Sequence, residues 1–295
     1  MALTINTNIS SLVAQNNLAK ATSSLNTAIE RMTTGYKINH AADNAAGYSI
    51  ARNWETQLGS LDVAADNAAT GADMLTTLED TYSLVTSHLQ RVRDLTEQAA
   101  NGTYGSQSLK AIQSEITARL EEVDRIAANC EFNGLKMMNG SMTNISLQVG
   151  LYGDADSRIE LKEDLFKEAD VDNLFTKHGG GGTLELATIA QKCSGLDSSG
   201  KIVGGQNAML SVIDNVINEI SSRVTTLGAA QNRIDSAIES IGVQSENITS
   251  SLSTLRDADI AEESSNYIQS QILQQAAATL LSTANQTPSI ALNLL

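Results

Sequence analysis

Apolar side chains, with an occasional Ser or Thr, recur along this chain at alternating steps of three and four residues. Three such rows occupy residues 18–32, 75–92 and 234–255. Rows with this spacing stay on one side of a slightly underwound helix and suit the knobs-into-holes packing of coiled coils. A further amphipathic row at 109–123 follows a turn at 101–105. The pattern predicts several long helices that pack lengthwise.

The pattern changes to a period of two in the middle of the chain. After the turn dipeptide Asn133-Gly134, apolar residues alternate with polar ones at residues 145–149 and again at 159–161. This alternation, with glycine and aspartate between the two segments, is typical of a β-hairpin.

The segment after the hairpin carries glycine runs at 179–182 and 204–205, and we expect residues 163–206 to be irregular. Helix is predicted to resume near residue 207, to break near Asp257 and to end with a last helix over about 260–285. The predicted fold is mainly α: an elongated antiparallel helical bundle or coiled coil with a small β-hairpin insert and both termini together.

Composition and charge limit the kinds of molecule that this chain is expected to bind. Aromatic residues make up 3% of the chain, proline occurs once, and the net charge is −15. Few large rings leave a thin core, which suits an elongated bundle. A polyanion repels phosphate backbones, so a nucleic-acid partner is not expected. No apolar stretch is long enough to span a bilayer, and the first residues lack the basic and apolar regions of a secretory signal. We therefore expect no membrane insertion, and either a cytoplasmic protein or export without a cleaved signal.

Candidate catalytic and ligand-binding residues are few. Of the three histidines, none lies in an HExxH pattern, and no P-loop or GxSxG motif is present. We expect no catalytic site, cofactor or metal, since Cys130, Cys193 and His178 lack the close pairing of metal ligands. The two cysteines are either unpaired small apolar residues or a disulfide that clamps the β insert.

The two terminal segments offer apolar residues without a strong helical context. Helices with so few large apolar side chains are marginal alone in water. One hypothesis is that they are disordered in the monomer and helical in an assembly. The alternative is a terminal helix pair folded back within a soluble monomer.

Several strings resemble bacterial flagellin, the subunit of the flagellar filament, in the right order along residues 1–160 and 207–295. They are Ile5–Ile9, Leu12, Gln15–Leu18, Met32–Asn39, Ala41–Gly47, Leu89–Leu95, Ile112–Ile116, Glu131–Gly134, Gln271–Ala276, Ala284–Pro288 and Leu294–Leu295. The resemblance is to a short form, because little room remains for a large outer variable domain.

The resemblance implies a homopolymeric tubular filament for motility. Residues 1–43 and 256–295 would form the inner coiled-coil domain. Residues 44–255 would form the outer helical domain, with the hairpin and a loop insert at about 140–206. The expected polymerisation seams are Ile5, Ile9, Leu12, Leu25, Ile29, Ile268, Ile272, Leu273 and Leu280.

The resemblance also implies partners and a location. The subunit would leave unfolded through the flagellar type III apparatus, without a cleaved signal, to an extracellular filament. Filament cap and hook-junction proteins, an export chaperone and an innate immune receptor of a host would be partners. The residues matching the receptor-binding helices are Arg91, Leu95 and Glu115, which could instead serve subunit packing. The alternatives are a hook–filament junction protein, an enzyme carried on a filament subunit and a soluble coiled-coil adaptor.

Overall fold

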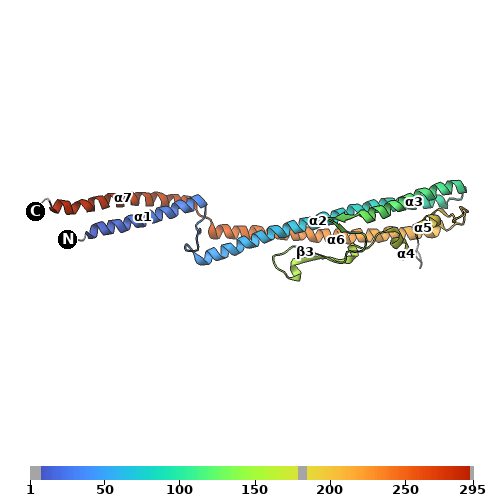
Figure 1. Cartoon of the computed structure of the whole chain (residues 1–295), viewed down its shortest axis with the longest axis horizontal. Coiled ribbons are helices and arrows are strands. Elements are labelled where there is room, and N and C mark those ends of the chain that lie inside the picture. Colours follow the sequence, from blue (N-terminus) through green and yellow to red (C-terminus); the bar gives the residue numbers. More distant parts are fainter. Residues whose placement is uncertain (1–7, 179–184, 293–295) are drawn as a thin grey trace. The chain divides into compact units, whose positions relative to one another are not determined.

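The computed structural model describes residues 8–178 and 185–292 of the chain (Figure 1). It is mainly helical with two small antiparallel strand pairs, which confirms the predicted fold class. The helices are α1 (Ile9–Thr34), α2 (Ala45–Ala100), α3 (Ser106–Asn129), α4 (Val171–His178), α5 (Leu186–Ser194), α6 (Gln206–Arg256) and α7 (Ile260–Leu292), with short 3-10 turns at Ala155–Ser157 and Glu163–Leu165.

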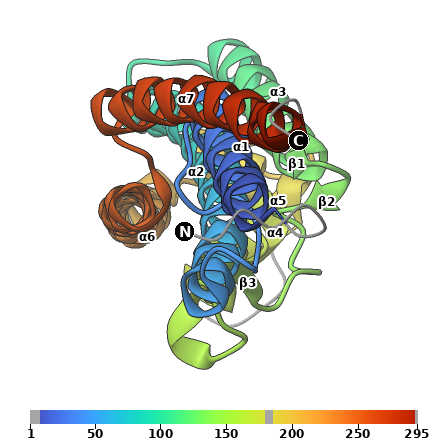
Figure 2. The same cartoon turned by 90° about the vertical axis from the view of Figure 1, so that its left-hand side faces the viewer.

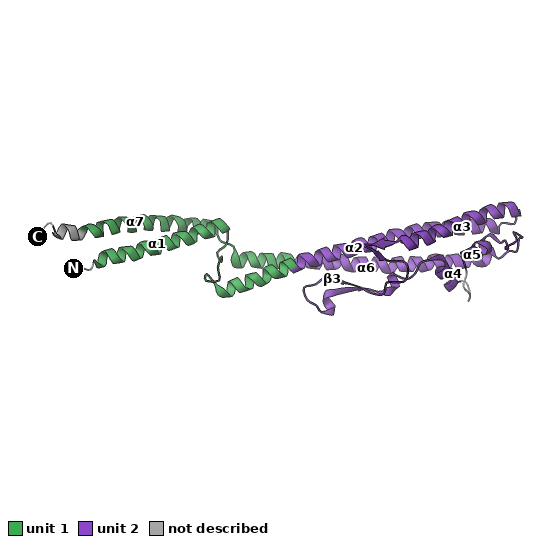
Figure 3. Cartoon of the chain, in the orientation of Figure 1, with its two compact units in different colours: residues 1–59, 245–295 green, residues 60–244 purple. Residues whose placement is uncertain are grey.

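The chain divides into two compact units (Figure 3). One takes in the described parts of residues 1–59 and 245–295, and the other residues 60–244. We call them the terminal unit and the outer unit. The domain boundaries expected from the sequence, at 43/44 and 255/256, lie in or beside the breaks between helices. The compact units divide within α2 and α6 instead.

The core of the outer unit is a lengthwise packing of α2, α3 and α6, which run side by side in Figure 1. The apolar rows predicted at 75–92 and 109–123 are buried along their whole length. α6 contributes Ile213, Val216, Ile220 and Leu227, all without exposed surface. The spacing of three and four residues therefore correctly predicted which side of α2 and α3 is buried.

One polar group inside this core has a defined partner. Tyr82 is fully buried, and its hydroxyl donates a hydrogen bond to the Leu165 carbonyl oxygen at 3.2 Å. Burial raises the pKa of the Tyr82 phenol, so the hydroxyl keeps its proton and remains a donor. A buried hydroxyl without a partner would cost free energy, and this bond removes that cost.

The strand pairs follow the sequence signals. β1 (Glu131–Phe132) and β2 (Leu135–Lys136) are joined by Asn133 and Gly134, both with positive φ, the geometry that a two-residue hairpin turn needs. The predicted hairpin is β3 (Ile145–Gln148) paired with β4 (Arg158–Leu161).

The β3–β4 hairpin lies against α2. The Asn67 side-chain amide donates to the Gln148 carbonyl oxygen at 3.2 Å. Gly71 lets the strand approach closely, because a Cβ there would lie 2.4 Å from Leu147 Cδ1. A glycine inside a helix usually weakens it, and here the missing side chain makes room for the hairpin.

Residues 163–206 are more regular than predicted, because they contain α4 and α5. Leu174, Phe175, Ile189 and Cys193 place their side chains in the core of the outer unit. Helices of 8 and 9 residues carry too few turns for a clear periodic signal, and tertiary burial stabilises them. The glycine run begins after α4 and lies outside the described residues.

A charged cluster attaches α4 to α6. The Glu219 carboxylate accepts hydrogen bonds from Lys177 Nζ at 2.7 Å, His178 Nε2 at 2.6 Å and Arg223 Nη2 at 2.8 Å. The nearly buried Arg223 also donates to the Lys167 and Glu168 carbonyl oxygens. Burial alone would raise the pKa of Glu219, but the hydrogen bonds from Lys177, Arg223 and His178 outweigh it and lower the pKa to about 2.

We expect Leu89→Ala to lower the free energy of unfolding of the outer unit by about 2–5 kcal/mol, because it leaves a cavity in a packed core. Leu89 has no exposed surface, whereas Leu84 on the same helix is 48% exposed. Leu84→Ala is the matched control and should change stability by less than about 1 kcal/mol. Thermal or urea unfolding followed by circular dichroism measures both, and equal losses would contradict the assigned packing.

The low pKa of Glu219 predicts a pH dependence of stability. The folded-state pKa lies below the unfolded value, so ionised Glu219 contributes stability that is present above about pH 4.5 and is lost as the pH falls towards about 2. Glu219→Gln should therefore be less stable than the natural chain at pH 7, and the two curves should converge over that window. The exposed Glu239→Gln on α6 is the control. A gap between Glu219→Gln and the natural chain that stays constant from pH 7 to pH 2 would refute this account.

Candidate assembly surface

The terminal unit is built on the antiparallel pair of α1 and α7, which lie side by side in both views (Figures 1 and 2). Hydrogen bonds join them along their length. Asn8 Nδ2 donates to the Ala284 carbonyl oxygen at 2.7 Å, and Gln274 Nε2 donates to Thr22 Oγ1 at 3.1 Å. At the other end, Arg31 and the buried Glu263 form an ion pair at 3.0 Å. These contacts fix the register of the pair.

The seam between α1 and α7 consists of small side chains. On α1, Ala14, Ala21 and Ala28 are buried, each seven residues after the last. On α7, Ser270 and Ala277 are buried with the same spacing. The distance between packed helix axes depends on the side chains at the contact, so small residues allow close approach. The fully buried positions of the seam are therefore small residues, while large side chains such as Leu18, Leu25 and Met32 are only half-buried.

Many large apolar side chains of the pair lie outside the seam. Of the residues expected to form polymerisation seams, Ile9 is 69% exposed and Leu280 62% exposed. Others that are exposed are Leu12, Ile29, Ile268, Ile272 and Leu273. Leu25 is half-buried beside the alanines, and Ile5 lies outside the described residues. We call these exposed side chains the terminal apolar rows.

The distribution within the pair is inverted relative to an ordinary soluble helix pair, in which large apolar residues lie at the contact. Isolated exposed apolar residues are common on proteins, but rows of them mark surfaces that bind other molecules. Each such side chain gains about 1.5–3 kcal/mol when it is fully buried.

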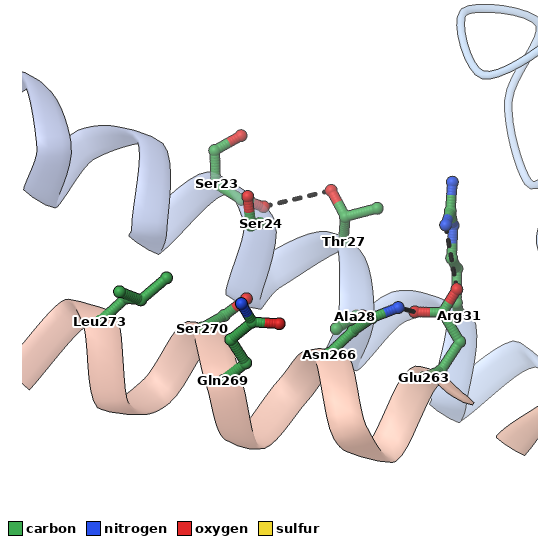
Figure 4. A pocket seen from close by; sticks show the side chains of 10 residues that line it. All are labelled: Ser23, Ser24, Thr27, Ala28, Arg31, Glu263, Asn266, Gln269, Ser270 and Leu273. Carbon is green, nitrogen blue, oxygen red and sulfur yellow. Dashed lines mark hydrogen bonds and ion pairs between the residues drawn. The ribbon is translucent and has the colours of Figure 1, made fainter. Parts of the chain in front are cut away.

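A shallow groove of about 420 Å³ lies between α1 and α7 (Figure 4). Its walls carry hydroxyl and amide groups, with the Arg31–Glu263 ion pair at one end and Leu273 at the other. The lining residues are Ser23, Ser24, Thr27, Ala28, Arg31, Glu263, Asn266, Gln269, Ser270 and Leu273. These hydroxyl and amide groups can make hydrogen bonds. Histidine and cysteine are not among the lining residues. The groove is thus suited to packing.

The structure brings two of the three expected receptor residues together. Arg91 on α2 and Glu115 on α3 form an ion pair at 2.9 Å with both side chains partly exposed. Leu95 does not share this surface, because it is 2% exposed and packs in the core of the outer unit. A direct receptor contact by Leu95 stays a prediction, and its burial favours the packing alternative that the sequence left open.

The possible disulfide between Cys130 and Cys193 is not formed, since both thiols are free and buried. Cys130 contacts Thr81 Oγ1 at 3.5 Å. Burial raises the pKa of both thiols, that of Cys193 to about 11. Within residues 8–178 and 185–292, no group of three or more His, Cys, Asp or Glu side chains could hold a metal ion.

Sequence reasoning missed the alanine seam. Its signal was present as small residues at intervals of seven, but alanine and serine add little to a hydrophobic pattern that is read from Leu, Ile and Val. The residues of the terminal apolar rows were noticed because their large side chains dominate that pattern, and their part in polymerisation stays a prediction.

Comparison with known proteins identifies the family. The N-terminal helical region of bacterial flagellins matches residues 5–143, and the C-terminal helical region matches residues 210–295. Polar flagellin F of Vibrio parahaemolyticus is 31% identical over 376 aligned residues, and the alignment covers all of both chains. A flagellin of Xenorhabdus nematophila is 35% identical over 312, again across all of both chains. The chain belongs to the bacterial flagellin family.

Family membership gives the function: the chain is a structural subunit of the flagellar filament, which is extracellular. A solved structure of a putative flagellar hook-associated protein from Vibrio parahaemolyticus aligns with 73% of this chain and 100% of its own, with a TM-score of 0.59. At 13% identity this likeness shows the fold alone. The described helices include none that is long and apolar enough to cross a membrane.

Proposed function

We propose that the subunit polymerises with identical copies by burying the terminal apolar rows of α1 and α7 against its neighbours. The observation that carries the proposal is the arrangement of the terminal pair, in which alanine and serine are buried at the internal contact and the residues of the terminal apolar rows are exposed. A large apolar surface of this kind lowers its free energy when other copies cover it.

In this proposal the terminal pair is only marginally stable before assembly. A seam of small side chains buries little area, so much of the burial that stabilises α1 and α7 comes from neighbouring subunits. The chain would leave the cell unfolded through the flagellar type III apparatus. An export chaperone would cover the C-terminal segment until assembly beneath a filament cap, on a base of hook-junction proteins. Catalysis has no part in this role.

A host innate immune receptor is proposed as a further partner of the outer helices. The support is the partly exposed Arg91–Glu115 pair, which joins α2 to α3 and presents charge and hydrogen-bonding groups to solvent. Leu95 would act beneath this surface, by packing that keeps the two helices in register.

Substitution of the terminal rows tests polymerisation. Ile272→Gln removes an apolar side chain that is 60% exposed in the subunit, so it should leave the unfolding of the outer unit unchanged. If neighbours bury this side chain, the loss of about 1.5–3 kcal/mol raises the concentration needed for elongation about 10- to 100-fold. Sedimentation and electron microscopy of seeded filaments measure this concentration.

The control for polymerisation is Val63→Gln, since Val63 on α2 has a similar exposure of 58% and lies outside the terminal rows. Elongation by this variant should stay within about threefold of the natural chain. If Ile272→Gln elongates as well as the natural subunit, or if Val63→Gln is equally impaired, the terminal rows do not carry assembly.

Receptor binding is tested with soluble monomer on cells that report receptor activation. Arg91→Ala should lower activation about tenfold, the effect of losing one charge-assisted hydrogen bond at an interface. Arg93→Ala is the control, because Arg93 lies on the same helix, is similarly exposed and pairs with Asp214 and Glu97 instead. Equal activation by both variants would reject the proposed surface.

A further inference from the structure

Two linkers of the terminal unit pair with each other. Residues 35–44 connect α1 to α2, and residues 257–259 connect α6 to α7. The Lys37 backbone N–H donates to the Arg256 carbonyl oxygen at 2.7 Å, and the Ala258 N–H donates to the Gly35 carbonyl oxygen at 2.8 Å. These bonds form an antiparallel bridge between Tyr36 and Asp257. We call this pairing the linker bridge.

The linker bridge needs support from side chains, because a short two-stranded pairing is marginal in water. Gly35 ends α1 and leads the chain into the linker bridge. Its φ of 75° is a left-handed conformation that turns the chain out of the helix. Lys37 adds one contact, from its Nζ to the Thr254 carbonyl oxygen at 2.8 Å. Neither contact ties the bridge to α2.

Arg256 makes that connection. It is the last residue of α6, and its guanidinium lies over the Tyr36 ring, 4.1 Å from the ring centroid. The same guanidinium forms an ion pair with Glu55 on α2, and its side chain is only 16% exposed. A cation over an aromatic ring and a shielded ion pair are each stronger than their exposed equivalents. One side chain therefore joins α6, the linker after α1, and α2.

Arg52 provides a comparison within the same unit. Its guanidinium also lies over a tyrosine ring, that of Tyr48 at 5.3 Å, and it also pairs with Glu55, at 3.0 Å. All three residues belong to α2, so these contacts stabilise one helix and connect no separate segments. The two arginines make the same kinds of contact, and only Arg256 joins different segments.

We propose that Arg256 is a positioning residue for assembly: by holding Tyr36 and Glu55 together it keeps the linker bridge closed, and so holds α1 and α7 to the parts of α2 and α6 that belong to the terminal unit. This inference rests on the proposed assembly through α1 and α7, because it assigns the clasp that presents their apolar rows. Tyr36 acts through its ring, and Glu55 acts through its charge.

Hydrogen exchange within filaments tests the proposal. Full-length Arg256→Gln subunits are grown on natural seeds, and exchange is followed in the peptides that contain the Lys37 and Ala258 amides, the two donors of the linker bridge. These amides should exchange about tenfold faster than in the natural chain, since both contacts of the guanidinium are lost. Tyr36→Leu should give the same result, whereas Tyr36→Phe keeps the ring and should restore natural exchange.

The control is Arg52→Gln, which should leave the exchange of both amides unchanged. Where Arg256→Gln subunits elongate, faster exchange than in Arg52→Gln filaments supports the positioning role. Where they unfold normally in the outer unit but fail to elongate, while Arg52→Gln subunits elongate, that failure supports it instead. The proposal is overturned if Arg256→Gln filaments form and exchange no faster than Arg52→Gln filaments, or if Tyr36→Phe exchanges as fast as Tyr36→Leu. The Ile272→Gln experiment is separate, so a failure of the assembly surface itself would be recognised independently.

Discussion

The close seam of alanine and serine between α1 and α7 is the constraint on which the terminal unit depends. Because small residues occupy the fully buried positions of this contact, many isoleucines and leucines of both helices are exposed. A pair held this way gives up most of the apolar burial that would make it stable alone. That burial is available from other copies of the chain, which agrees with a family whose members are structural subunits of a filament. Assembly and the folding of the terminal pair are thus coupled in the proposed function.

The outer unit follows the opposite rule. Its long helices bury Leu, Ile and Val along continuous rows and have an internal core, with Tyr82 and Arg223 satisfying carbonyl oxygens of the segment that precedes α4. Leu89 and Leu120 are buried within the subunit itself, so the packing of the outer unit needs no neighbour. In the proposed function the terminal unit, by contrast, gains its remaining apolar burial on assembly. The linker bridge, with Arg256 at its centre, belongs to the part that assembly completes.

Much of the fold could be predicted from the sequence wherever a regular spacing or a characteristic turn residue marks an element. The rows at 75–92 and 109–123, the Asn133-Gly134 turn and the break near Asp257 were confirmed, because period and turn chemistry are local properties. The helices α4 and α5 were missed because they are short and stabilised by distant partners. The burial of Leu95 was not foreseen, because helical spacing places a residue on a helix and does not say what covers it. The contacts of Arg256 join residues about 200 positions apart in the sequence, and no local pattern reports them.

The two cysteines have a consequence for the material that the subunits form. A filament outside the cell meets dissolved oxygen, and disulfide exchange requires an accessible thiolate. Both thiols are buried, and burial raises the pKa of each, so they stay protonated at neutral pH. The sulfur atoms are therefore unreactive towards disulfide exchange while the outer helices are folded. With both sulfur atoms inside the fold, neither is available to form a disulfide with another subunit, so these cysteines are not expected to add covalent cross-links between copies.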